Sequence, residues 1–146
     1  MERQSLHELV DRYVEVYVFA AKRVAAMISD EILEKVTPEQ FTVLSYIQKN
    51  GPCLTSQISE YCSVNPGATT AMLNRLVNKG YVERSLNLKD RRVVLVNITE
   101  KGQGLVEAGY ASAYKLVESL SDQFTSEEIE TFIKVFGKLA RIFEKD

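Results

Sequence analysis

The chain has 146 residues, of which 45% are hydrophobic and 26% charged, as is usual for a globular protein with one core. It has no apolar run of about 18 residues, so a membrane-spanning helix is excluded. The first residues, with Glu2 and Arg3, do not resemble a signal peptide, and we expect a cytoplasmic protein with no membrane partner.

The charge is distributed unevenly along the chain. The net charge is −2, but the segment from Leu54 to Ile98 holds six cations and three anions. This segment therefore carries +3, and the rest of the chain carries −5. A basic middle between acidic ends agrees with a nucleic-acid contact, although +3 over this length also arises by chance.

Few residues are available for metal binding or catalysis. His7 is the only histidine, and the spacing of Cys53 and Cys62 fits no zinc motif, so we expect no metal and no cofactor. We expect both thiols to be reduced and to serve as small buried side chains. No carboxylate is paired with a nucleophile or a glycine-rich phosphate loop, and an enzyme is not expected.

Residues 5–29 are expected to form a long amphipathic helix. Apolar side chains recur every three or four residues, and further apolar positions widen the stripe over much of the helix surface. A helix that is apolar on more than one side needs two neighbours. In a chain this short, the second neighbour is expected to come from another copy.

Thr37 begins the next helix, with Pro38 at N1 and Gln40 completing a capping box, and Asn50-Gly51-Pro52 ends it. Two short helices follow. Thr55 is expected to cap the first, which runs to about Cys62. Asn65 is expected to cap the second, which ends at Gly80. The turn of three residues between them is typical of a helix-turn-helix.

After Gly80 the pattern changes to strands, at residues 81–85 and 93–98, around a polar hairpin loop at residues 87–92. A helix-turn-helix followed by a β-hairpin is a winged helix. Thr99 then caps a long helix to about Leu120, and Ser126 starts a last helix with a strong apolar stripe. The predicted fold is mainly α with a small β-hairpin wing.

The second helix of the helix-turn-helix has two different sides at 100° per residue. Ala68, Thr69, Met72, Leu73 and Leu76 gather on the side expected to face the core. The other side is small or neutral and polar, which suits a DNA major groove, and Arg75 and Lys79 are expected to reach phosphates. Thr69 is counted among the candidate DNA contacts as well. These candidates are Asn65, Gly67, Thr69, Thr70, Ala71, Asn74 and Arg75.

The hairpin supplies a second set of candidate DNA contacts. Arginine inserts readily into a narrow minor groove, and the loop is rich in it. Asp90 is interpreted as a carboxylate that holds Arg92 or Arg84 in position. The alternative is a charged turn kept polar for solubility. The wing candidates are Arg84, Lys89, Asp90, Arg91 and Arg92.

Several runs together resemble the MarR family of winged-helix transcription regulators. They are Val64-Asn65-Pro66, Asn74-Arg75-Leu76, the run from Lys79 to Arg84, Asp90-Arg91-Arg92 and the run from Leu95 to Gly102. The resemblance covers nearly the whole chain. It implies one domain over residues 1–146, with a winged-helix core at about 37–100 and dimerisation helices at about 5–29 and 100–144.

The resemblance further implies a homodimer that binds a near-palindromic double-stranded DNA operator, with repression the expected outcome. The candidate dimer contacts are Leu6, Leu9, Ile129, Phe132, Phe136, Leu139 and Phe143. Thr70, Asn74, Arg75 and Arg92 match DNA-contact positions of the family. Ala71 departs from it, because many members have a long polar side chain there.

Members of the family often respond to small phenolic ligands. The side chains of Tyr13, Tyr17, Phe41 and Tyr46 could line a cleft for such an effector, although each could equally be a core aromatic. Peroxide-sensing members use a cysteine in the first helix, and this chain has none there. The alternative function is a winged helix that contacts only proteins, which would require an apolar exposed face on the second helix.

Overall fold

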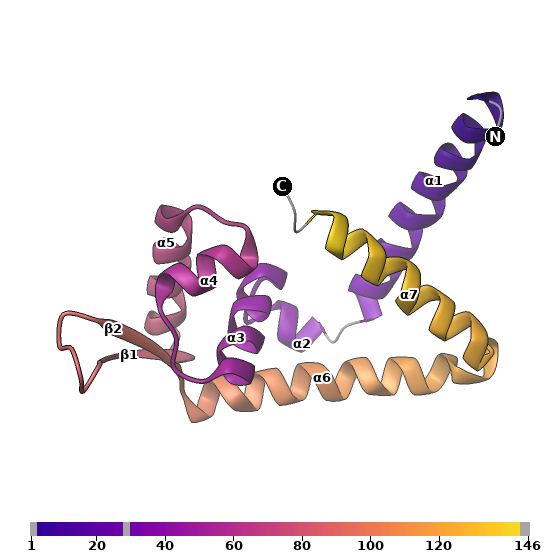
Figure 1. Cartoon of the computed structure of the whole chain (residues 1–146). Coiled ribbons are helices and arrows are strands. Elements are labelled where there is room, and N and C mark those ends of the chain that lie inside the picture. The colour runs from indigo at the N-terminus through magenta and orange to yellow at the C-terminus, as the bar shows by residue number, and fades with distance from the viewer. Residues whose placement is uncertain (1–2, 28–29, 144–146) are drawn as a thin grey trace. The chain divides into compact units, whose positions relative to one another are not determined.

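The computed structural model describes residues 3–27 and 30–143, with helices throughout and one small sheet (Figure 1). The chain divides into two compact units, Met1–Ser112 and Ala113–Asp146. The elements in order are α1 (Arg3–Met27), α2 (Asp30–Leu33), α3 (Pro38–Asn50), α4 (Thr55–Cys62), α5 (Pro66–Asn78), β1 (Val82–Leu86), β2 (Val94–Ile98), α6 (Glu100–Leu120), the 3-10 turn η1 (Ser121–Gln123) and α7 (Ser126–Phe143).

The ends of α3 form as the sequence predicts. The Thr37 hydroxyl accepts the backbone N–H of Gln40 at 3.2 Å, and the Gln40 side chain accepts that of Thr37 at 3.1 Å. This reciprocal box satisfies two N–H groups that have no partner within the helix. Gly51 ends the helix at φ 72°, a conformation that glycine adopts without strain.

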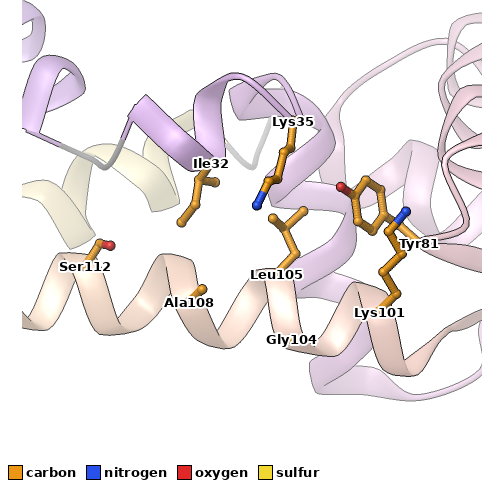
Figure 2. A pocket seen from close by; sticks show the side chains of 8 residues that line it. All are labelled: Ile32, Lys35, Tyr81, Lys101, Gly104, Leu105, Ala108 and Ser112. Atoms are coloured by element: carbon orange, nitrogen blue, oxygen red, sulfur yellow. The ribbon is translucent and has the colours of Figure 1, made fainter.

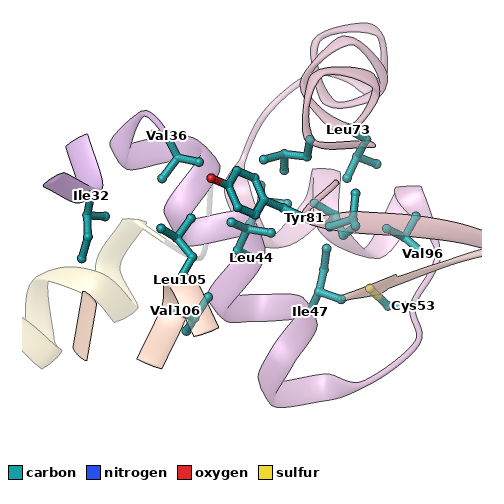
Figure 3. Packing of buried hydrophobic residues seen from close by; sticks show 14 residues of the cluster. Ile32, Val36, Leu44, Ile47, Cys53, Leu73, Tyr81, Val96, Leu105 and Val106 are labelled. Atoms are coloured by element: carbon teal, nitrogen blue, oxygen red, sulfur yellow. The ribbon is translucent and has the colours of Figure 1, made fainter. Parts of the chain in front are cut away.

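The core of the first unit surrounds α3 (Figure 3). Leu44 and Ile47 of α3 are fully buried, together with Leu73 of α5 and Val96 of β2. Cys53 joins this core and pairs with Val96 as an isolated antiparallel bridge, so the segment before α4 acts as a short third strand. The core therefore fixes α5 and the hairpin on one scaffold.

The junction between the hairpin and α6 is tightly packed. The Thr99 hydroxyl donates to the carbonyl of Gly80 at 2.6 Å and accepts the N–H of Gly102 at 3.1 Å, which confirms its predicted capping role. A Cβ on Gly102 would overlap the Tyr81 carbonyl oxygen and would lie 2.7 Å from Cγ1 of Ile98. Only glycine therefore allows α6 to start this close to β1.

α1 and α7 keep large apolar side chains exposed. On α1, Leu9, Val16 and Phe19 are 56%, 66% and 64% exposed. On α7, Phe132 and Ile133 are 60% and 63% exposed. α7 is capped by Thr125, whose N–H and hydroxyl bind the Glu128 carboxylate and hold the pKa of that carboxyl below its usual value. The side chains of Leu6, Leu139 and Phe143 lie outside the described part of the structure.

One sequence expectation about the helices was wrong, and one short helix was missed. Thr55 does not cap α4, because the helix already includes it and Leu54 stands at the N-cap with its N–H bound to Oε1 of Gln57 at 2.8 Å. The four-residue helix α2 was not predicted, since one helical turn is too short to show a period. Among the described residues, no helix is long and apolar enough to cross a membrane.

Candidate DNA interface

The turn between α4 and α5 positions the whole site. Ser63 takes a left-handed conformation at φ 52°, and the N–H of Val64 donates to the carbonyl of Ser59 at 3.1 Å. Asn65 then caps α5, because its side-chain oxygen accepts the N–H of Ala68 at 2.8 Å, and Pro66 follows at N1. The predicted turn and cap are confirmed, and they fix the direction in which α5 leaves α4.

The buried side of α5 agrees with the predicted core side at Leu73 and Leu76, which are fully buried. Ala68 is exposed, contrary to the prediction. Thr69 is only 2% exposed, and its hydroxyl donates to the carbonyl of Asn65 at 3.1 Å. The choice of Thr69 as a DNA contact was therefore wrong, because its side chain faces the protein core.

The opposite side of α5 is exposed and carries no acidic side chain. It consists of Gly67, Thr70, Ala71, Asn74, Arg75 and Asn78. The Thr70 hydroxyl donates to the carbonyl of Pro66 at 3.0 Å, which leaves its oxygen facing outward as an acceptor. Apart from Arg75, this surface is small, polar and neutral, so the helix can enter a major groove and approach base edges closely.

β1 and β2 pair as an antiparallel hairpin, and Val82 lies opposite Ile98. At the tip, Nε and Nη2 of Arg92 bind the two carboxylate oxygens of Asp90 at 3.1 and 3.3 Å. The backbone N–H of Arg92 also donates to this carboxylate, at 3.1 Å. The hydrogen bonds from Arg92 hold the pKa of Asp90 below its usual value. The prediction that Asp90 orients Arg92 is confirmed, although the Arg92 side chain stays 90% exposed.

Arg84 has a different partner from the one expected. Its Nη2 donates to Oδ1 of Asn74 at 2.8 Å, which ties β1 to the exposed side of α5. The sequence did not reveal this contact, because the two residues are ten positions apart on different elements. Lys89 and Arg91 are exposed in the same hairpin loop.

Lys79, expected at a phosphate, is instead used inside the protein. Its Nζ donates to the carbonyl of Lys35 at 2.7 Å, and its own carbonyl accepts Nζ of Lys101 at 2.7 Å. The Lys101 ammonium also lies 4.8 Å from the centre of the Tyr81 ring. These contacts tie the C-terminal end of α5 to α6 and to the loop before α3.

The same region lines a pocket of about 260 Å³ in the first unit (Figure 2). Its wall combines apolar side chains with two amines and two hydroxyls. The lining residues are Ile32, Lys35, Tyr81, Lys101, Gly104, Leu105, Ala108 and Ser112.

None of the four aromatic residues predicted for an effector cleft lines this pocket. Tyr13 stacks on Tyr17 with ring centres 5.8 Å apart. Phe41 pairs with Tyr110 at 6.0 Å, and Tyr46 pairs with Tyr61 at 4.4 Å. The predicted cleft residues therefore belong to three separate ring pairs.

The two cysteines are free thiols, and burial raises the pKa of both Cys53 and Cys62. A raised pKa lowers the thiolate fraction and with it the reactivity of the sulfur. Cys53 is buried, as predicted, whereas Cys62 is only half-buried against the core.

The exposed side of α5 lies next to the β1–β2 hairpin, in which Asp90 orients Arg92. These two features together define the chain as a winged-helix protein suited to binding DNA. The family model described as "MarR family" matches residues 36–94. The multiple antibiotic resistance protein MarR of Escherichia coli is 38% identical over 106 residues, which cover 71% of this chain and 73% of that protein. The chain belongs to the MarR family.

Two further relatives agree with this assignment. The transcriptional repressor MdtR of Bacillus subtilis is 35% identical over 118 residues, covering 80% of this chain and 76% of that protein. The structure of Streptococcus pneumoniae FabT in complex with DNA is 26% identical, covers 99% of both chains and gives a TM-score of 0.74. The chain is thus a MarR-type DNA-binding transcription regulator and not an enzyme, and the predicted winged-helix fold is confirmed.

Proposed function

We propose that this protein is a cytoplasmic repressor that binds a near-palindromic operator as a homodimer. The observation that carries the proposal is the exposed, neutral side of α5 next to the wing arginine that Asp90 orients. Thr70 and Asn74 would meet base edges, and Arg75 would meet the phosphates beside the groove. Repression is favoured because MdtR, a relative of similar length, is named a repressor.

The wing supplies affinity and position. Arg92 is bound to Asp90 through two nitrogen–oxygen contacts, so its guanidinium is already oriented before DNA arrives. Less rotamer entropy is then lost on binding. Arg91 and Lys89 add positive charge at the same hairpin loop, where a narrow minor groove attracts it.

A second copy is proposed to cover the apolar side chains of α1 and α7. Phe132 and Phe136 stack on each other with ring centres 4.4 Å apart and are still 60% and 40% exposed. With Ile129 and Ile133 they form an apolar stripe on α7. Exposed apolar surface of this kind marks a protein interface. Of the predicted contacts with described side chains, Leu9, Ile129, Phe132 and Phe136 are all exposed and available for it.

A small-molecule effector is proposed for the pocket between α2 and the first turns of α6. Its amines and hydroxyls suit a small phenolic or acidic compound, and its size of about 260 Å³ fits a single ring. Lys101 lines this pocket and also donates to the carbonyl of Lys79 after α5. A ligand that draws Lys101 away would therefore release the C-terminal end of the DNA-contacting helix.

The proposal is tested by selecting bound DNA from a random pool with the purified protein. We expect enrichment of an inverted repeat whose half-sites lie about 10 base pairs apart, one turn of the double helix. Absence of any enriched sequence would contradict it. Repeating the selection with small phenolic acids tests the effector, which should lower recovery of the wild-type site. A Lys101→Met variant, which lacks the bond to the Lys79 carbonyl, should bind the site more weakly without ligand and respond less to the ligand.

A further inference from the structure

The contact between Arg84 and Asn74 joins a strand residue to a side chain on the DNA-facing side of α5. The bond from Nη2 of Arg84 to Oδ1 of Asn74 is 2.8 Å long. Arg84 lies two residues after Val82 on β1 and pairs with Val96, so its side chain leaves the sheet on the same face as these two buried valines. The side chain of Arg84 therefore leaves the sheet on the side that packs against α5, and it reaches Asn74 rather than pointing away from the protein.

The chemistry of this bond fixes the orientation of the Asn74 amide. A guanidinium carries only donors, so the Asn74 atom that faces it must be the acceptor oxygen. The Nδ2 group is then on the other side of the amide. A free asparagine can rotate by half a turn and offer either atom, but Asn74 next to Arg84 has one favoured orientation.

We propose that Arg84 is a positioning residue that sets which base Asn74 reads. Asparagine pairs with adenine through both amide atoms, since its oxygen accepts from N6 and its nitrogen donates to N7. Arg84 uses one of the two lone pairs of Oδ1, so the N6 donor of adenine would have to share that oxygen with a cationic donor. Guanine offers two acceptors, N7 and O6, and needs only the Nδ2 donors. The structure therefore points to guanine opposite Asn74.

The competing role for Arg84 is a direct wing contact to DNA, as expected from its sequence position, which on β1 would be a contact to a phosphate. The bond to Asn74 uses one of five guanidinium N–H groups, so both roles are compatible with the structure. They differ in what the loss of Arg84 does. A phosphate contact is equally strong on every sequence, whereas a positioning residue acts at a single base position.

The test compares DNA selections by the wild type, Arg84→Ala, Asn74→Ala and the double variant. The inference rests on the proposed operator binding, so the selection with the wild type comes first and shows whether any DNA sequence is enriched. We expect the wild type to prefer guanine over adenine roughly tenfold at one position in each half-site. Arg84→Ala should lose or reverse that preference and keep the others. In the Asn74→Ala background, Arg84→Ala should change no preference.

Two further variants serve as controls. Arg91→Ala removes the same charge from the hairpin and should weaken all sequences alike. Arg84→Lys, whose ammonium also only donates, should retain part of the guanine preference. If Arg84→Ala weakens every site equally and keeps the wild-type preference, the inference is overturned while the proposed function stands. If the wild type selects adenine at that position, the inference is also overturned. If the wild type enriches no DNA sequence, both the proposed operator binding and the positioning role of Arg84 are contradicted.

Discussion

The winged-helix core and the long helices α1 and α7 differ in how far their apolar side chains are buried. In the core, Leu44, Ile58 and Leu73 are fully buried by neighbours from the same chain. On α1 and α7, side chains of the same kind, such as Val16 and Ile133, are more than 60% exposed. The core is complete within one chain, whereas the proposed second copy would cover the apolar side chains of α1 and α7. Under the proposed function, DNA reading and dimerisation depend on different residues, and we expect that they can be changed separately.

The largest effect is expected from a charge placed on the apolar stripe of α7. Ile133→Glu would bury a carboxylate in the proposed dimer interface, at a cost of about 3 kcal/mol or more, which corresponds to over a hundredfold weaker association. Sedimentation equilibrium measures the dissociation constant. Thr131→Glu adds the same charge on the other side of the helix and should leave the dimer intact. Equal effects of both changes would count against an interface at this stripe.

A smaller effect, on the stability of the winged-helix core, is expected from a substitution at the start of α6. Gly102→Ala should lower the free energy of unfolding by about 1–3 kcal/mol, because the new methyl group overlaps the Tyr81 carbonyl. Gly104→Ala lies in open space in the same helix and should be neutral or stabilising by up to about 1 kcal/mol. Denaturant unfolding of both variants checks this. Similar stabilities would show that the close approach of α6 to β1 is not required.

The wing is expected to contribute affinity that depends on salt. The double change Arg91→Ala and Arg92→Ala should weaken operator binding roughly tenfold at moderate salt. It should also reduce the slope of log affinity against log salt by about 2, because two cations no longer displace counterions from the DNA. Fluorescence anisotropy at several salt concentrations measures both quantities. An unchanged slope would remove the wing from the interface, while the dimer and the core should be unaffected in either case.

The smallest expected effect is the pH dependence of the Asp90–Arg92 pair. Hydrogen bonds from Arg92 lower the pKa of Asp90 in the folded protein. The pair therefore contributes fully to the free energy of unfolding at pH values above the pKa that Asp90 has in the unfolded chain. The contribution is lost only as pH falls through the lower, folded value. Operator binding should therefore show no step from Asp90 near neutral pH. A carboxyl titration by NMR should give a higher Asp90 pKa in Arg92→Ala than in the wild type, and equal values would contradict the pairing.

Signals carried by close neighbours in the chain were predictable from the sequence. The Thr37 box, the Asn65 cap, the Thr99 cap and the Asp90–Arg92 pair all join residues at most four positions apart. Hydrophobic periods and turn residues then fixed the order of helices and strands. The family resemblance rested on these same local runs.

Features that depend on distant residues were not predictable. Lys79 was expected at DNA, but its partner Lys35 lies 44 positions away. The Arg84–Asn74 bond and the pocket beside Lys101 likewise need the packed core to bring their members together. Thr69 was misplaced for a different reason. Threonine is common on helix surfaces, and its hydroxyl was satisfied within the helix, so its polarity did not indicate its burial.

The division of roles between the core and the outer helices is tested most directly by the molar mass of the wild-type protein, free and bound to its selected operator. Light scattering at micromolar concentration should give two chains in the free state and two chains on one inverted repeat. A free monomer that binds a single half-site as tightly as the full repeat would contradict this account, because α1 and α7 would then need no second copy.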